Sequence, residues 1–162
     1  MQIGDRPLLL VDIDGVISVW GFPPDQAPEG VWCTVDGIVH FLSASAAGHL
    51  RTLAERFDLV WCSGWEEKAN EYLPRALDLG PLPHVTFETG PGGRTVHWKL
   101  HGIDAQALER PLAWIDDAHD DSCHAWARRR GAPTLLVATE PAVGLTAAHV
   151  EELMAWAQAI SS

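Results

Sequence analysis

The fold is decided by the stretch Leu8-Leu9-Leu10-Val11-Asp12-Ile13-Asp14-Gly15, in which four apolar residues are followed at once by two carboxylates and a glycine. An unbroken apolar run, as opposed to an alternating one, indicates a strand that is buried on both faces, as in a parallel sheet. In an open α/β sheet, ligands bind outside the carboxyl ends of the strands. We therefore expect Asp12 and Asp14 to lie at a functional site.

Further apolar runs of the same kind occur along the chain. They predict strands at residues 58–62, 112–115 and 134–137, with a weaker one at 84–87. Helical stripes of apolar residues lie between or after these runs, at 46–57, 65–76, 123–127 and 150–160. Strand–helix alternation of this kind predicts an α/β fold with a mostly parallel sheet flanked by helices.

Residues 20–41, called the flap segment below, break this alternation. They contain three prolines and then two β-rich stretches separated by Asp36-Gly37, a strong signal for a β-hairpin. Residues 88–95 are glycine-rich and predict a loop. Because the sequence shows no repeat and no interdomain linker, we expect one domain over residues 1–162.

Composition excludes several classes of function. The chain of 162 residues carries 11 basic and 22 acidic residues, a net charge of −11. This charge excludes a broad cationic face that would bind a nucleic-acid backbone. A nucleic acid is therefore expected only as a substrate that binds through its end. No apolar run approaches the roughly 20 residues that span a bilayer, and no secretory signal is visible. We expect a cytoplasmic protein with no membrane partner.

Polar residues also follow two of the other expected strands. Ser63-Gly64 comes after the run at 58–62, and Asp116-Asp117 comes after the run at 112–115. Since the carboxyl ends of parallel strands meet at one edge of the sheet, these residues should gather near Asp12. Two carboxylates as close in sequence as Asp12 and Asp14 can take different roles when their surroundings separate their pKa values.

These residues together resemble the four motifs of the haloacid dehalogenase (HAD) superfamily, over residues 8–137. Residues 8–16 match the first motif in the DxDG(T/V) form of its phosphatases, and Ser63 matches the second. Lys99, within residues 96–100, matches the third motif, and Asp116-Asp117 matches the fourth. Residues 60–70 are more loosely similar to a HAD domain associated with RNA-repair proteins. The resemblance implies a Rossmann-like core.

The resemblance also implies a chemistry, that of a Mg²⁺-dependent phosphomonoester hydrolase. Asp12 would attack phosphorus and form an aspartyl-phosphate. Asp14 would protonate the leaving oxygen and then deprotonate the attacking water. Mg²⁺ would be held by Asp12, the backbone carbonyl of Asp14 and Asp116, while Asp117 would act through water or as an orienting group.

The second and third motifs would bind the phosphoryl group. Lys99 would offset its negative charge, and Ser63 with the Gly64 amide would hydrogen-bond its oxygens. The gaps between motifs are too short for an inserted cap domain, so we expect an open site covered only by the hairpin. An open site suits a large phosphorylated substrate, such as a nucleic-acid end or a phosphoprotein.

Three alternatives stay open at this point. The protein is either this enzyme, a HAD-like binding or regulatory module without turnover, or a phosphatase of small metabolites. Asp120 or Asp121 is an alternative fourth-motif acid, although acidic residues also favour the first turn of a helix. Trp20 and Trp32 of the flap segment either pack the hairpin, cover the phosphate or stack on a base.

Overall fold

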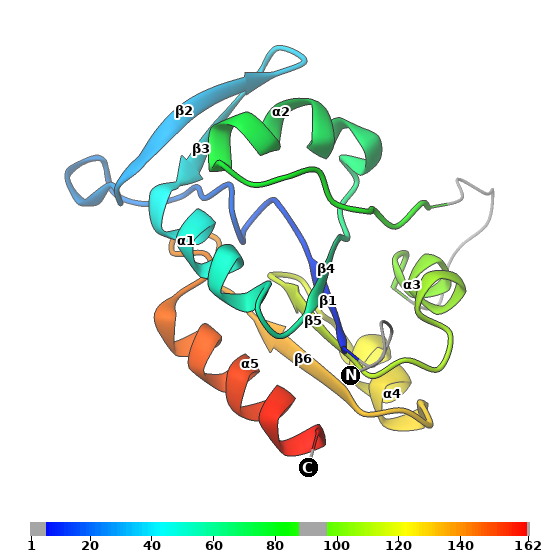
Figure 1. Ribbon diagram of the computed structural model, residues 1–162. Helices are drawn as coiled ribbons and strands as arrows, with labels where there is room; N and C mark the ends of the chain where they lie inside the picture. The colour runs from blue at the N-terminus through cyan, green and yellow to red at the C-terminus, as the bar shows by residue number, and fades with distance from the viewer. Residues whose placement is uncertain (1–5, 88–96, 162) are drawn as a thin grey trace.

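The first strand, β1, lies inside a four-stranded parallel sheet with the order β4-β1-β5-β6 (Figure 1). The computed structural model describes residues 6–87 and 97–161. The strands of the sheet are β1 (Leu8–Val11), β4 (Asp58–Trp61), β5 (Leu112–Asp116) and β6 (Thr134–Ala138). β1 pairs with β4 on one side and β5 on the other, and every residue of β1 is buried. The sheet confirms the predicted α/β class.

Helices cover both faces of this sheet, which explains why its strands are apolar without alternation. Leu9 and Val11 contribute to one hydrophobic core, while Leu8 and Leu10 contribute to a second core on the opposite face. The first core is covered by α1 (Ala44–Leu53), α2 (Ala69–Leu77) and α5 (Ala147–Ile160). The second core is covered by α3 (Leu100–Ala107) and α4 (Asp121–Arg129). Alternate strand residues therefore all find apolar neighbours.

The flap segment forms the predicted hairpin, from β2 (Gly30–Val35) and β3 (Ile38–Ser43). Asp36 and Gly37 both have positive φ, 51° and 82°, as a tight hairpin turn requires. The tip of the hairpin is attached to the start of α2, because Lys68 pairs with Asp36 and the Tyr72 hydroxyl donates to Asp36 Oδ1 at 3.4 Å. Figure 1 shows the hairpin beside α2, above the sheet.

The weaker strand expected at residues 84–87 is wrong in extent. It consists of a single bridge between Trp61 and His84, in which Trp61 N donates to Pro83 O and Val85 N donates to Trp61 O. Pro83 has no N–H to donate, so the ladder does not extend before His84. It does not extend further along the segment either, since Phe87 N donates to Glu66 Oε1 at 2.7 Å. The loop expected at residues 88–95 lies outside the described residues.

Between β1 and β4, a stretch described in full, the chain forms a short 3-10 helix η1 (Pro24–Gln26), the hairpin and α1. These elements leave no room for a cap domain in that gap. A second 3-10 helix, η2 (Glu66–Lys68), leads into α2. In the parts of the chain that the structure describes, no helix is long and apolar enough to cross a membrane.

Candidate active site

The polar residues that follow β1, β4 and β5 lie close together because the backbone hydrogen bonds between these parallel strands continue to the strand ends. Asp12 N donates to Ile115 O at 3.0 Å, and Cys62 N donates to Val11 O at 2.8 Å. The residues that follow β1, β4 and β5 therefore leave the sheet at the same level. The structure brings Asp12, Ser63 and Asp116 to this one edge, and all three side chains are buried.

Asp12, Asp116 and Asp117 form a compact acid cluster. Each offers one carboxylate oxygen, and these oxygens all lie within 4.8 Å of one another. Burial raises the pKa of Asp12 to about 8, although Lys99 opposes the shift. Burial, followed by the nearby Asp116, also raises the pKa of Asp117. Ionised carboxylates so close together need positive charge among them.

Lys99 supplies part of that charge. Its Nζ lies 3.1 Å from Asp12 Oδ1 and 2.6 Å from Asp116 Oδ2, and it donates to the Cys62 carbonyl at 3.0 Å. Burial alone would lower the pKa of Lys99, but Asp12 and Asp116 raise it above its ordinary value. Burial likewise acts to raise the pKa of Asp116, but Lys99 outweighs it and holds that pKa low.

The acid cluster fits a divalent cation. With three ionised carboxylates and one ammonium group, the formal charge of the cluster is −2. Hard carboxylate oxygens are the ligands that Mg²⁺ prefers, and its size requires them to lie close together. The residues present therefore match the metal that the sequence resemblance implies.

Gly15 allows the acid cluster to close. Its φ is +83°, and a Cβ added there would lie 2.4 Å from the Asp117 Cγ atom. Only glycine permits both the turn and this close approach. Thr139, at the end of β6, holds the same turn: its hydroxyl donates to Gly15 O at 2.7 Å, and its N–H donates to Asp116 O at 3.2 Å. Thr139 was not predicted, although its place after a strand is the signal that identified the others.

Asp14 lies apart from the acid cluster in a more open environment. Trp65 Nε1 donates to Asp14 Oδ2 at 3.1 Å, and His40 Nδ1 lies 3.5 Å from Asp14 Oδ1. The rings of His40 and Trp65 pack edge to face, with centroids 4.8 Å apart. Asp14 is about half exposed, so its carboxylate is accessible to a ligand while these two side chains orient it. Nothing in the sequence pattern predicted that His40 and Trp65 would contact Asp14.

Ser63 and Gly64 begin the turn after β4. The Ser63 hydroxyl accepts a hydrogen bond from Trp65 N at 3.2 Å, and Ser63 is buried. Gly64 faces the partly exposed Trp98, and a Cβ at position 64 would lie 3.8 Å from that ring. These residues lead directly into Trp65, whose indole contacts Asp14.

The two alternative acids lie elsewhere. Asp120 is the N-cap of α4, since its Oδ1 accepts hydrogen bonds from Cys123 N at 3.1 Å and from the Ser122 hydroxyl at 2.5 Å. Asp121 is the first residue of α4. Neither belongs to the acid cluster, and a capping role accounts for the position of Asp120.

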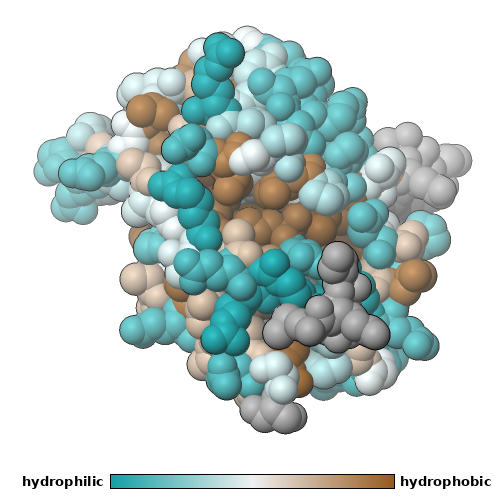
Figure 2. Space-filling view, in the orientation of Figure 1, coloured by the Kyte–Doolittle hydropathy of each residue, from teal (hydrophilic) through white to brown (hydrophobic). Residues whose placement is uncertain are grey.

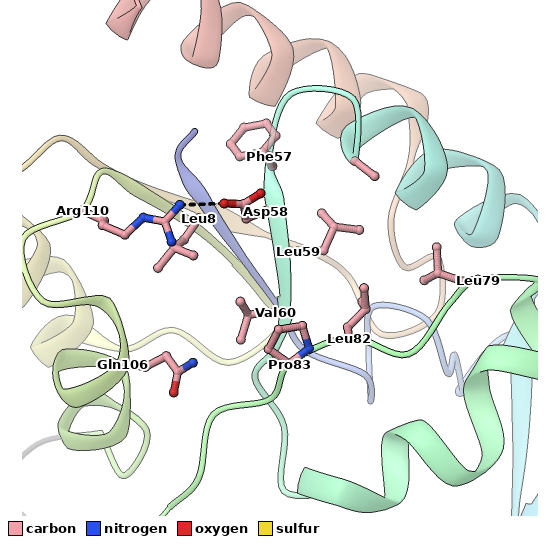
Figure 3. A pocket seen from close by; sticks show the side chains of 11 residues that line it. Leu8, Phe57, Asp58, Leu59, Val60, Leu79, Leu82, Pro83, Gln106 and Arg110 are labelled. Carbon is pink, nitrogen blue, oxygen red and sulfur yellow. Dashed lines mark hydrogen bonds and ion pairs between the residues drawn. The ribbon is translucent and has the colours of Figure 1, made fainter. Parts of the chain in front are cut away.

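A different hollow lies along the outer edge of β4. Figure 2 shows apolar residues gathered in the middle of the face in view. Figure 3 shows a pocket of about 390 Å³ whose lining includes Leu59, Leu82 and Pro83. In Figure 3, Arg110 pairs with Asp58 beside this pocket, at 2.8 Å. Its lining includes Asp58, Leu59 and Val60 of β4 and none of the acid cluster, so this pocket is separate from the candidate active site.

The parallel sheet, the carboxylates after β1 and the buried lysine define a HAD-type α/β protein. A family model described as the HAD domain in Swiss Army Knife RNA repair proteins matches residues 8–150. The chain belongs to this family, which confirms the resemblance found in the sequence. Proteins of this superfamily are generally hydrolases and typically use a divalent metal. A comparison with curated proteins found no match.

Proposed function

We propose that this protein is a Mg²⁺-dependent phosphomonoester hydrolase that acts through an aspartyl-phosphate. The observation that carries the proposal is the different environment of the two motif carboxylates. Asp12 is buried beside Lys99, whereas Asp14 is about half exposed and accepts a hydrogen bond from Trp65. Mg²⁺ would be held by Asp12, Asp116 and the Asp14 backbone carbonyl, with Asp117 acting through water. When bound, the cation offsets the charge of the carboxylates and of the phosphoryl oxygens.

The first half-reaction forms the covalent intermediate. An oxygen of the Asp12 carboxylate bonds to phosphorus while the bond between phosphorus and the leaving oxygen breaks. The electron pair of the broken bond stays on the leaving oxygen, which takes a proton from the Asp14 carboxyl group. Lys99, the Ser63 hydroxyl and the Gly64 amide bind the phosphoryl oxygens.

The second half-reaction restores the enzyme. Asp14, now a carboxylate, takes a proton from a water molecule whose oxygen bonds to phosphorus. The bond between phosphorus and Asp12 breaks, and inorganic phosphate leaves. Both carboxyl groups then have their starting protonation states, so the reaction consumes one water per ester.

We propose a phosphorylated nucleic-acid end as the substrate. The family description refers to RNA repair proteins, which favours this substrate over a phosphoprotein. Between β1 and β4 the chain forms no cap domain, which supports a site open enough to accept a polymer end. The net charge of −11 supports recognition of the end itself and not of a long stretch of backbone.

The test is phosphate release from oligonucleotides that carry a 3′- or 5′-phosphate, with Mg²⁺ or with a chelator. We expect Mg²⁺-dependent release by the wild type and background release by Asp12→Asn, since the amide is not a nucleophile. Asp25→Asn, in the exposed η1 helix, is the matched control and should behave as wild type. Binding without turnover by the wild type would instead indicate a regulatory module, and a preference for free sugar phosphates would contradict the polymeric substrate.

A further inference from the structure

A second pocket, called the flap pocket below, adjoins the candidate active site. It has a volume of about 490 Å³ and lies between residues 18–22 and the hairpin. Its lining includes Asp14, Trp20, Phe22, Trp32 and His40. Asp14 lines this pocket and is also a residue of the candidate active site, so the two adjoin at Asp14.

The walls of the flap pocket are aromatic and partly exposed to solvent. The side chain of Trp32 is 67% exposed and that of Trp20 is 49% exposed. Phe41 packs edge to face on Trp32, with ring centroids 4.9 Å apart, and on Phe22 at 5.3 Å. Exposed aromatic side chains gathered around one hollow indicate a binding site and not a core.

The flap pocket is held in shape at both ends. At the hairpin tip, Asp36 pairs with Lys68 of η2. At the base, Val19 N donates to Phe41 O at 2.9 Å, and Trp20 N donates to Pro141 O at 3.0 Å. A ligand would therefore enter a largely preformed site and would not have to order a loose segment.

The position of Asp14 identifies which part of a substrate reaches this pocket. Asp14 gives its proton to the leaving oxygen, so that oxygen must lie beside the Asp14 carboxylate. The rest of the leaving group is bonded to that oxygen, and the flap pocket is the hollow that Asp14 lines. The pocket therefore receives the leaving group, while the phosphoryl group stays at Asp12.

We propose that the flap pocket binds the nucleobase of the nucleotide that carries the terminal phosphate, an inference that rests on the proposed function. Bases stack on aromatic rings with little regard to their identity. Among the described residues that line the pocket there is no lysine or arginine, so a second phosphate would find no counter-charge there. Trp32 and Trp20 provide the flat surfaces, and His40 and Ser18 offer polar atoms at the rim that faces Asp14.

The experiment compares kcat/KM for adenosine 5′- and 3′-monophosphates with kcat/KM for the base-free ribose phosphate of the same linkage, all with Mg²⁺. We expect the wild type to prefer the nucleotide by about tenfold or more in at least one linkage, the order of effect that stacking of one base supplies. Trp32→Leu should lose most of this preference, whereas Trp32→Phe keeps a ring and should retain most of it.

The control is Leu108→Ala, a change at a 74% exposed side chain in the turn after α3, which should keep the wild-type preference. Because Trp32 is exposed, both of its variants should melt at the wild-type temperature. Equal kcat/KM for nucleotide and ribose phosphate in the wild type, or an unchanged preference in Trp32→Leu, would contradict nucleobase binding in the flap pocket. Neither result would contradict the proposed hydrolase activity. If the wild type hydrolyses no phosphate ester, both the hydrolase activity and the nucleobase site are contradicted. A preference for phosphopeptides over nucleotides would contradict the nucleobase as the ligand of the flap pocket.

Discussion

Asp12 and Asp14 lie two residues apart, yet they face different surroundings. Asp12 is buried 3.1 Å from the Lys99 ammonium group, while Asp14 is half exposed and accepts a hydrogen bond from Trp65. Turning of the chain at Ile13 and Gly15 thus separates a buried carboxylate from an accessible one. Such a separation is what allows one carboxyl group to attack and the other to exchange protons.

Replacing Asp14 tests this division of roles. Asp14→Asn should lower kcat by roughly 10²–10⁴-fold, because only proton transfer is lost. Its affinity for Mg²⁺ should stay close to that of the wild type, since the backbone carbonyl is kept and the Asp14 side chain lies outside the acid cluster. Steady-state kinetics and calorimetric titration measure the two quantities. If the affinity falls as far as it does in Asp116→Ala, the roles assigned to Asp14 are wrong.

The raised pKa of Asp12 predicts how Mg²⁺ binding depends on pH. In the metal-free protein this pKa is about 8, so at lower pH the cation must displace a proton. Mg²⁺ affinity should therefore rise with pH, by up to about tenfold per pH unit, and level off above about 8. The same raised pKa means that the folded metal-free protein binds more protons than the unfolded chain, so its stability should fall as pH rises toward 8.

Both effects are measurable by titration calorimetry and thermal melting between about pH 6 and pH 8. Asp12→Asn is the control, because it should remove this contribution of Asp12 to the pH dependence of stability. An affinity for Mg²⁺ that does not change over this range would show that Asp12 is already ionised in the metal-free protein.

At the scale of elements, the turn after β1 is what places the acid cluster. Gly15 has positive φ and lies close to Asp117, and Thr139, directly after β6, ties the same turn to the sheet. The hairpin and the turn before η2 then contact Asp14, through His40 and Trp65 respectively. Three separate segments of the chain thus fix the geometry of one motif.

Gly15→Ala should weaken Mg²⁺ binding strongly, because the added Cβ would displace the Asp117 carboxylate. Gly37→Ala is a matched control: Gly37 has nearly the same φ, +82°, but nothing lies within 4 Å of an added Cβ. The control should cost only the backbone strain, about 1–2 kcal/mol, and leave Mg²⁺ affinity unchanged. Equal losses of Mg²⁺ affinity in the two variants, measured by calorimetry, would contradict the role given to Gly15.

The sequence predicted those elements whose pattern reflects burial on both faces. Leu8–Val11 and residues 112–115 are apolar throughout because helices cover both sides of the sheet, and the same logic located the acids that follow them. The strand expected at 84–87 is limited to one bridge, because Pro83 lacks an N–H on one side and Phe87 N donates to the Glu66 side chain on the other. Helix α3 was not foreseen, since it has eight residues and contains Gly102. Contacts such as Trp65 with Asp14 join residues 51 positions apart, and no local pattern encodes them.

At the scale of the whole molecule, charge and metal binding are linked. The chain has a net charge of −11, and three of its carboxylates converge on one buried cluster. Lys99 offsets only part of their mutual repulsion, and a bound cation would offset the rest. A cation that binds only the folded state therefore stabilises the entire fold.

Millimolar Mg²⁺ should raise the melting temperature by several degrees when its concentration is about 100 times Kd, and a chelator should reverse the change. Asp116→Ala should abolish most of this shift, because Asp116 belongs to the acid cluster. Asp121→Ala removes a carboxylate from the first turn of α4 instead and should leave the shift in place. If Asp121→Ala or Asp120→Ala causes the larger loss in a melting experiment, the metal lies nearer α4 than the acid cluster does.

The central claim is that the Asp12 carboxylate attacks phosphorus, and rapid acid quench tests it most directly. The enzyme with Mg²⁺ would be mixed with a phosphate-ended oligonucleotide for less than one turnover, quenched and digested for mass spectrometry. We predict one phosphoryl group on the peptide that contains Asp12 in the wild type and none in Asp12→Asn. The phosphorylated peptide should be more abundant in Asp14→Asn if loss of the general base slows hydrolysis of the intermediate more than its formation. Phosphate release at the wild-type rate by Asp12→Asn, or turnover with no phosphoryl group ever found on Asp12, would contradict the account.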